Sequence, residues 1–199
     1  MNTLSIHHPL LKRYDTLYTL GERQALLQQM INEIQWQTNF VAFGRRFEMP
    51  RRQAWYADQG VHYRYSDNML QSFSWNDTLL QLKNKVEEKT RQSFNSVLVT
   101  YYRDGHDHVT WHADDEVELG DSPVIASFSL GASRRFCYRQ RHTGEEAEVN
   151  LHDGELLLMQ AGFQEDYEHC VPEEPKIKEP RINLTFRNVV IKRESDQEK

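Results

Sequence analysis

The second half of the chain, from Val97 onward, constrains the fold more than any other part of the sequence. It consists of short runs that are rich in β-forming residues, and Gly, Asp or Pro residues separate these runs. The six runs are VLVTYY, PVIASFSLG, RRFCYR, EVNL, ELLLMQA and RINLTFRNVVI. Such a series is typical of an antiparallel β structure such as a jelly roll, also called a double-stranded β-helix.

Two amphipathic helices are expected before these strands. Residues 19–36 begin at Thr19 with a capping-box pattern, and their apolar residues recur at i, i+3, i+4 and i+7. A second helix is expected near residues 77–91, with Asn76 or Asp77 as its N-cap. Because the helices precede the strands instead of alternating with them, the sequence predicts an α+β fold with N-terminal helices and a jelly-roll core.

The chain has 199 residues, which suits one folded domain, and no stretch has the composition of a linker. We therefore expect a single domain over residues 1–191, with the jelly-roll core at about residues 95–191. The intervening residues 40–75 contain glycine, proline and many aromatic residues, so they are expected to form short hairpins and loops. The charged residues 192–199 are expected to form a disordered tail.

Composition argues against several classes of protein. No run reaches the roughly 18 apolar residues that a transmembrane helix requires, and the N-terminus lacks the apolar region of a signal peptide. The two cysteines, Cys137 and Cys170, do not suggest a disulfide framework and fit a reducing compartment. We therefore expect a cytoplasmic monomer with no membrane partner.

The formal net charge of −6 argues weakly against nucleic-acid binding, but the charges are unevenly distributed. Residues 45–52 contain four arginines and one acid, and residues 134–141 contain four arginines and no acid. These clusters are interpreted either as solvated strand ends or as groups that hold phosphate.

The segment VTWHADDE places His112 and Asp114 two residues apart, so in an extended chain both side chains lie on the same side. Two histidines and one carboxylate on one face of an ion leave positions open for other ligands, which suits non-haem iron(II). Spacing alone does not identify the second histidine, because several candidates lie downstream and another i, i+2 pair lies upstream. The downstream candidates are His142, His152 and His169, and the upstream pair is His106 and His108.

The last predicted strand, RINLTFRN, indicates what could fill the open positions. Its apolar residues alternate with polar ones, so one face is expected to pack in a core. The other face carries Arg181 and Arg187, six residues apart, with Asn183 and Thr185 between them. Since guanidinium groups bind carboxylates bidentately, a dicarboxylate such as 2-oxoglutarate would satisfy this face. An edge strand with a solvated polar face is the alternative.

Together these segments resemble the AlkB family of iron(II)- and 2-oxoglutarate-dependent dioxygenases, especially the members that act on alkylated nucleic acid. The resemblance covers about residues 38–190, and the order and spacing of its motifs are highly specific. These motifs are PRRQAWY, YRDGHDHVTWHADDE, IASFSLGASRRF, DYEHCVP and PRINLTFR.

The resemblance implies iron(II) as the cofactor, 2-oxoglutarate as the co-substrate and O2 as the oxidant. It assigns the metal to His112, Asp114 and His169, because the family's distal histidine lies twelve residues before the first arginine of the last strand. It assigns five residues to 2-oxoglutarate, namely Thr100, Tyr102, Arg181, Asn183 and Arg187. Thr100 departs from the family, which usually has asparagine two residues before this tyrosine.

On the substrate side, the resemblance implies a lid at about residues 40–75 that recognises a nucleotide. Enzymes that act on a base must remove it from the stack, and an aromatic ring can hold either the flipped base or the gap. Phe43 resembles the family's wedge residue, and Glu116 matches a family acid near the exocyclic amine of the substrate. The complete set assigned to the substrate is Phe43, Arg51, Tyr63, Tyr65 and Glu116.

The implied function is oxidative demethylation of 1-methyladenine and 3-methylcytosine in alkylated DNA, with RNA as a further candidate, which releases succinate, CO2 and formaldehyde. These bases are cationic, so aromatic faces and a nearby carboxylate would attract them. One alternative is a hydroxylase or demethylase that acts on a protein or a small molecule. Another is a non-enzymatic jelly-roll module that holds zinc or no metal, and it predicts that Arg181 and Arg187 do not converge near His112.

Overall fold

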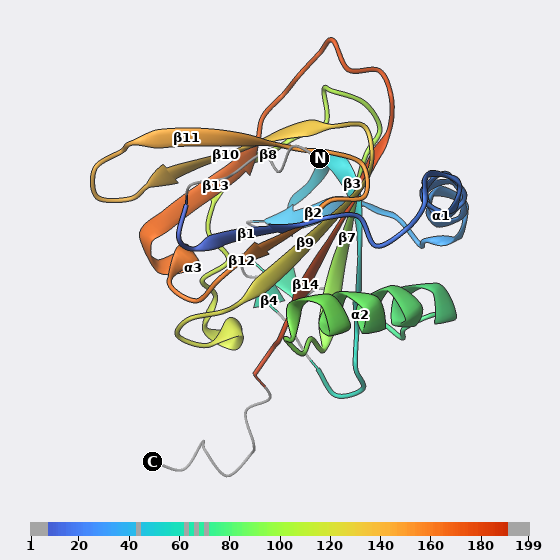
Figure 1. Ribbon diagram of the computed structural model, residues 1–199, viewed down its shortest axis with the longest axis horizontal. Coiled ribbons are helices and arrows are strands. Elements are labelled where there is room, and N and C mark those ends of the chain that lie inside the picture. Colours follow the sequence, from blue (N-terminus) through green and yellow to red (C-terminus); the bar gives the residue numbers. More distant parts are fainter. Residues whose placement is uncertain (1–7, 43–44, 62–63, 66–67, 70–71, 191–199) are drawn as a thin grey trace.

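A computed structural model of the chain describes residues 8–42, 45–61, 64–65, 68–69 and 72–190 (Figure 1). Within these residues two largely antiparallel sheets enclose a cavity, and two helices cover the outer face of the larger sheet. This is the α+β, double-stranded β-helix architecture that the sequence predicts. No helix in these ranges is long and apolar enough to cross a membrane.

The larger sheet has eight strands in the order β1-β12-β9-β14-β7-β3-β2, and the short β6 pairs in parallel with β3. Its strands are β1 (Leu11–Tyr14), β2 (Gln37–Ala42), β3 (Arg45–Ala57), β6 (Ser72–Phe73), β7 (Ser96–Tyr102), β9 (Ile125–Gly131), β12 (Leu156–Met159) and β14 (Arg181–Arg187). Strand β14 lies between β9 and β7. The polar face of the last strand is therefore not the wet face of an edge strand, because it lies at the centre of the sheet.

The smaller sheet has four strands in the order β11-β10-β13-β8. They are β8 (Val109–His112), β10 (Arg134–Gln140), β11 (Glu146–Leu151) and β13 (Tyr167–Val171), and a separate ribbon is formed by β4 (Arg64–Tyr65) and β5 (Asn68–Met69). Strand β8 forms one edge of this sheet, and its His112 is the direct partner of His169 on β13. The pairing of these two strands therefore brings together two of the predicted metal ligands.

Both predicted helices are present. Helix α1 (Leu20–Glu33) starts after Thr19 with the predicted capping box, and α2 (Asp77–Thr90) starts after Asn76, whose side chain accepts a hydrogen bond from a backbone N–H. Helix α1 ends three residues earlier than predicted, because Ile34 already has an extended backbone. Two short helical turns complete the described fold, η1 (Val117–Leu119) and α3 (Phe163–Asp166).

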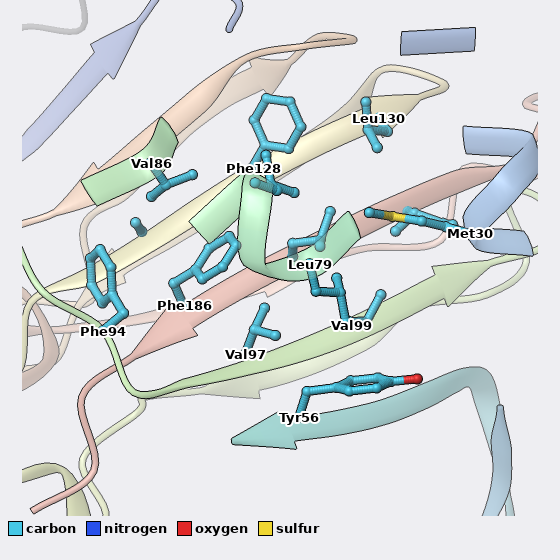
Figure 2. Close-up of a cluster of buried hydrophobic side chains, with 14 of the residues drawn as sticks. Met30, Tyr56, Leu79, Val86, Phe94, Val97, Val99, Phe128, Leu130 and Phe186 are labelled. Atoms are coloured by element: carbon cyan, nitrogen blue, oxygen red, sulfur yellow. The ribbon is translucent and has the colours of Figure 1, made fainter. Parts of the chain in front are cut away.

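The main core lies between these two helices and the outer face of the larger sheet (Figure 2). Met30 of α1 and Leu79 of α2 pack with side chains of β3, β7, β9 and β14, including Tyr56, Val97, Val99, Phe128 and Phe186. On β14 the alternation works as predicted, since Ile182, Leu184 and Phe186 are fully buried in this core. The polar residues of β14 therefore face the other way, toward the smaller sheet.

The prediction of short hairpins and loops for residues 40–75 is wrong in one respect, because β3 continues for 13 residues from Arg45 to Ala57. Pro50 and four arginines interrupt the apolar alternation that would have indicated a strand. The strand forms because β2 pairs with its first part and β7 pairs with its second part. Strand β1 was not predicted either, because its four residues, LKRY, are too few to show an alternation of apolar and polar residues. The predicted tail, residues 192–199, lies outside the described residues.

Candidate metal centre and co-substrate pocket

A cavity between the two sheets brings together most of the predicted metal and co-substrate residues. Its lining includes the predicted residues Arg51, Thr100, Tyr102, His112, Asp114, His169, Asn183 and Arg187. Strands β3, β7 and β14 of the larger sheet supply one wall, and β8, β10 and β13 of the smaller sheet supply the other. The two walls meet where β8 begins, since the His108 amide donates to the Pro50 carbonyl oxygen at 3.0 Å.

Three potential metal ligands converge at one end of this cavity. One ligand atom each from His112, Asp114 and His169 lies within 4.8 Å of the others, and the two imidazole rings are 4.3 Å apart. Among the residues that the structure describes, no other group of three such side chains comes this close. His152 instead lies 2.9 Å from the Ser133 hydroxyl. The geometry thus selects His169 among the downstream histidines.

The protonation states of the three side chains suit a divalent metal. Burial alone would raise the pKa of Asp114, but Arg187 and the two histidines lower it to about 2. Burial lowers the pKa of His169 to about 3, so its imidazole is neutral at physiological pH. His112 Nδ1 lies 2.8 Å from the Thr110 carbonyl oxygen, which can only accept, so Nδ1 carries a proton and Nε2 is the nitrogen that would face the metal. A carboxylate and imidazole nitrogens are donors that iron(II) accepts.

Arg187 holds the metal-facing carboxylate in place. Its Nη2 donates to both oxygens of Asp114 at 2.7 Å, and its Nε donates to Oδ2 at 3.2 Å. The Asp114 side chain is 1% exposed, so this ion pair is desolvated. Arg187 was predicted to bind a carboxylate of 2-oxoglutarate, and that role stays a prediction because its observed partner is Asp114.

Arg181 lies at the other end of β14, and some of its N–H groups are not used in hydrogen bonds within the described residues. It is 1% exposed, donates from Nη2 to the Ser129 hydroxyl at 3.0 Å, and stacks 5.1 Å from the ring of Tyr102. Burial lowers its pKa, and its Nε and Nη1 have no hydrogen-bond partner within the described part of the chain. A buried guanidinium with unused donors calls for an anion, and a carboxylate of 2-oxoglutarate fits it.

Asn183 lies between the two arginines, and most of its amide is already used. Its Nδ2 donates to the Ser127 hydroxyl at 2.8 Å and to the Phe128 carbonyl oxygen at 3.1 Å, and its Oδ1 accepts from Thr185 at 3.0 Å. These bonds fix the orientation of the amide. Its predicted contact with 2-oxoglutarate is therefore limited to the remaining lone pair of Oδ1.

The structure describes only some of the residues that were predicted to bind the substrate. Phe43 and Tyr63 lie outside the described residues, and for Tyr65 only the backbone, in β4, is described. Arg51 lines the cavity and donates to the His108 carbonyl oxygen at 3.3 Å. Glu116 is the half-buried N-cap residue of η1 and is not among the residues that line the cavity.

The arginine cluster at residues 134–141 is not a free cationic patch. Each of its four guanidiniums is paired with at least one carboxylate of the chain. The pairs are Arg134–Glu174, Arg135–Glu148, Arg135–Glu174, Arg139–Glu168 and Arg141–Asp115. The interpretation of this cluster as a phosphate-binding group is therefore not supported, whereas Arg45 and Arg46 in the other cluster are exposed.

Arg134 is a structural residue of the site that sequence reasoning missed. It is 1% exposed and donates to the carbonyl oxygens of Asp104, Asp107 and Pro172 at 2.7–3.1 Å. It therefore joins the loop that leads into β8 to the loop that follows β13. Its guanidinium also lies 5.4 Å from the ring of Tyr102, on which Arg181 stacks as well.

We expect Arg134→Met to lower the free energy of unfolding by roughly 2–3 kcal/mol, because one buried and two partly buried carbonyl oxygens lose their donor. Urea denaturation of the metal-free protein measures this loss. Arg135→Met is the matched control, since Arg135 is 39% exposed and its ion pairs are worth less than about 1 kcal/mol. Equal losses in both variants would contradict the role given to Arg134.

Two free cysteines lie on the outer side of the metal-bearing strands. Cys137 on β10 and Cys170 on β13 are direct partners across the two strands, and neither forms a disulfide. Cys170 is buried, and burial together with Cys137 raises its pKa to about 12. It follows His169 in sequence, so its side chain points to the opposite side of the sheet from the metal ligand.

A double-stranded β-helix with two histidines and one carboxylate at one end of its cavity, and a buried guanidinium beside them, has the donor set that suits non-haem iron(II). Comparisons with known proteins agree. A sequence profile described as the 2OG-Fe(II) oxygenase superfamily matches residues 12–187. The chain therefore belongs to this superfamily and, within it, to the family of AlkB homologues.

Two relatives illustrate the likeness. The chain is 39% identical over 181 residues to alpha-ketoglutarate-dependent dioxygenase alkB homolog 3 of Bos taurus, which covers 85% of this chain and 63% of that protein. It is 35% identical over 189 residues to DNA oxidative demethylase ALKBH2 of Mus musculus, which covers 89% of this chain and 79% of that protein. The chain thus spans somewhat less than two thirds of the alkB homolog 3 protein.

A solved structure described as "The structure of OsALKBH1" has the same fold. The TM-score is 0.62 at 17% sequence identity, and the match covers 91% of this chain and 99% of that one. At this identity the likeness concerns the fold alone. The superfamily name itself states Fe(II) and 2-oxoglutarate, which agrees with the predicted cofactor and co-substrate.

Proposed function

We propose that the protein is an oxidative demethylase that repairs N-alkylated bases in DNA, chiefly 1-methyladenine and 3-methylcytosine, with RNA as a further candidate. The observation that carries this proposal is the 35% identity to a protein named DNA oxidative demethylase, over 79% of that protein's length. The convergence of His112, Asp114 and His169 beside Arg187 supports it. A non-enzymatic binding module would not need this convergence.

Iron(II), 2-oxoglutarate and O2 together supply the oxidation of the N-methyl group, which leaves as formaldehyde while 2-oxoglutarate becomes succinate and CO2. The chain contributes binding, orientation and the exclusion of water. His112, Asp114 and His169 would hold the iron, and Arg187 fixes the carboxylate among them. Arg181 would bind a carboxylate of 2-oxoglutarate with its unused donors. Apolar side chains of β10, β12 and β13 line the cavity and would limit the access of water.

The proposal includes a substrate side formed by β3 and the lid at residues 40–75. Exposed Arg45 and Arg46 would hold phosphate groups near the cavity, and Arg51 lines the cavity itself. We further propose that a single copy of the chain suffices for activity and that it works in the cytoplasm. Tyr63 and Tyr65 are proposed to contact the flipped base, and Phe43 is proposed to fill the gap that this base leaves.

The test is incubation with iron(II), 2-oxoglutarate, ascorbate and oligonucleotides that carry one 1-methyladenine or 3-methylcytosine. Single- and double-stranded DNA and RNA are compared, with unmethylated oligonucleotides as controls. We expect mass spectrometry to show loss of the methyl group, with one formaldehyde and one succinate for each methyl removed. If the folded, iron-loaded protein makes succinate but removes no methyl group from any oligonucleotide, the proposal is wrong.

A further inference from the structure

The cavity contains a buried amide that the protein itself does not use. Gln53, on β3, is 5% exposed and lines the cavity. Its side chain makes no hydrogen bond to the residues that the structure describes. Neither of its amide atoms is among the fully enclosed polar atoms that lack a partner, so the amide opens onto the cavity. A ligand or water in the cavity can therefore supply its hydrogen bonds. Gln53 is therefore a candidate for contact with whatever fills the cavity.

Gln53 lies two strands away from the arginines of β14. It is the cross-strand partner of Thr100 on β7, and Thr100 is in turn the partner of Asn183 on β14. With strands about 4.8 Å apart, the backbone of Gln53 lies roughly 10 Å from that of Asn183 and further from Arg181 and Arg187. The same face of β3 also carries Arg51, two residues earlier. Gln53 thus belongs to the wall that adjoins the lid.

The chemistry of an amide also differs from what a carboxylate needs. A carboxylate only accepts hydrogen bonds, and the unused Nε and Nη1 of Arg181 can supply them. The Gln53 amide offers a donor and an acceptor in one plane. This pair complements a planar group with neighbouring acceptor and donor atoms, such as N7 and the 6-amino group of 1-methyladenine.

We infer that Gln53 hydrogen-bonds the polar edge of the target base and so helps to determine substrate specificity. This inference rests on the proposed function and names a contact within the same cavity. A base that cannot pair with Gln53 leaves the amide unsatisfied in a dry site, and such a site rejects ligands that lack the matching group. The contact discriminates between bases, whereas the arginines of β14 act on the co-substrate.

The first test is Gln53→Leu, which keeps the size of the side chain and removes its hydrogen bonds. We expect kcat/KM for an oligonucleotide with 1-methyladenine to fall roughly 10- to 100-fold. The KM for 2-oxoglutarate should stay within about 2-fold of the original value. The Tm of the metal-free protein should not fall, because the side chain of Gln53 makes no hydrogen bond to the described residues that the substitution could remove. A merely structural glutamine would instead show a lower Tm.

A readout without turnover is the affinity of the metal-free protein for a fluorescent oligonucleotide, measured by anisotropy. Gln53→Leu should weaken binding of the 1-methyladenine oligonucleotide and leave binding of the unmethylated one unchanged. The matched control is Gln160→Leu, because Gln160 donates from Nε2 to the Pro9 carbonyl oxygen, outside the cavity. Gln160→Leu should change neither the kinetics nor the affinity.

Gln53→Glu separates base contact from co-substrate contact. The methylated base is cationic, so a carboxylate here should keep more activity than leucine does and should leave the KM for 2-oxoglutarate unchanged. The inference is wrong if either variant raises the KM for 2-oxoglutarate and leaves the KM for the oligonucleotide unchanged. It is also wrong if Gln53→Leu changes neither of these KM values. If the unaltered protein removes no methyl group from any oligonucleotide, the proposed function fails instead.

Discussion

Replacing His169 with alanine should lower succinate production more than about 100-fold and should abolish tight binding of iron(II). Loss of an outer-shell partner of a metal ligand typically costs 10- to 100-fold, so loss of a ligand itself costs more. His169 is buried, and its imidazole is neutral because burial lowers its pKa to about 3. No other described histidine comes near enough to His112 and Asp114 to replace it.

The matched control for this experiment is His142→Ala, since spacing alone made His142 an equal candidate. His142 lies at the exposed turn between β10 and β11, so its removal should change neither metal binding nor turnover. Calorimetry with manganese(II) under anaerobic conditions measures binding, and thermal unfolding verifies that both variants are folded. Undiminished succinate production by a folded His169→Ala variant would exclude His169 as a ligand.

Arg187→Met should lower the free energy of unfolding of the metal-free protein by about 3–5 kcal/mol. The substitution leaves the Asp114 carboxylate buried, at 1% exposure, without the guanidinium that neutralises it. Urea denaturation measures the loss. Manganese(II) should restore part of it, about 2.7 kcal/mol at a concentration of 100 times its Kd, because the bound cation takes over the neutralisation.

Two further variants make this result interpretable. Asp114→Asn in the Arg187→Met background should recover stability without metal, since no buried charge is left unpaired. Arg141→Met is the matched surface control. Arg141 pairs with Asp115, the residue after Asp114, and their side chains are 32% and 52% exposed, respectively. It should cost less than about 1 kcal/mol. A similar small loss in Arg187→Met would mean that the buried pair is not needed to stabilise Asp114.

The parts of this fold that the sequence predicts are those with a local signal. A capping box at Thr19 and an N-cap at Asn76 correctly locate the starts of both helices. The strict alternation in β14 correctly separates the apolar face, which packs in the main core, from the polar face, part of which lines the cavity. The resemblance of the motifs supplied the family, which the comparisons confirm.

The parts that were missed depend on partners distant in sequence. Strand β3 forms because β2 and β7 pair with it, although its own composition is that of a loop. Arg134 belongs to a sequence cluster that suggests a charged surface, yet it shares the buried face of β10 with Phe136 and Tyr138. The spacing of two residues between these three side chains indicates that they lie on one face of a strand. The sequence gives no indication that the Gln53 amide lacks a partner, because its hydrogen bonds depend on residues that the fold brings close to it.

Under the proposed function iron(II) and O2 would meet close to the cross-strand cysteines, so the reactivity of these thiols would affect how long the protein stays active. Thiolates react with oxidants far faster than thiols do, and exposed thiolates react fastest. Cys170 is next in sequence to a metal ligand, but its pKa of about 12 and its burial keep it protonated and shielded. Cys170, the thiol next in sequence to the proposed ligand His169, is therefore poorly reactive toward oxidants. This low reactivity would allow many turnovers before oxidation inactivates the protein.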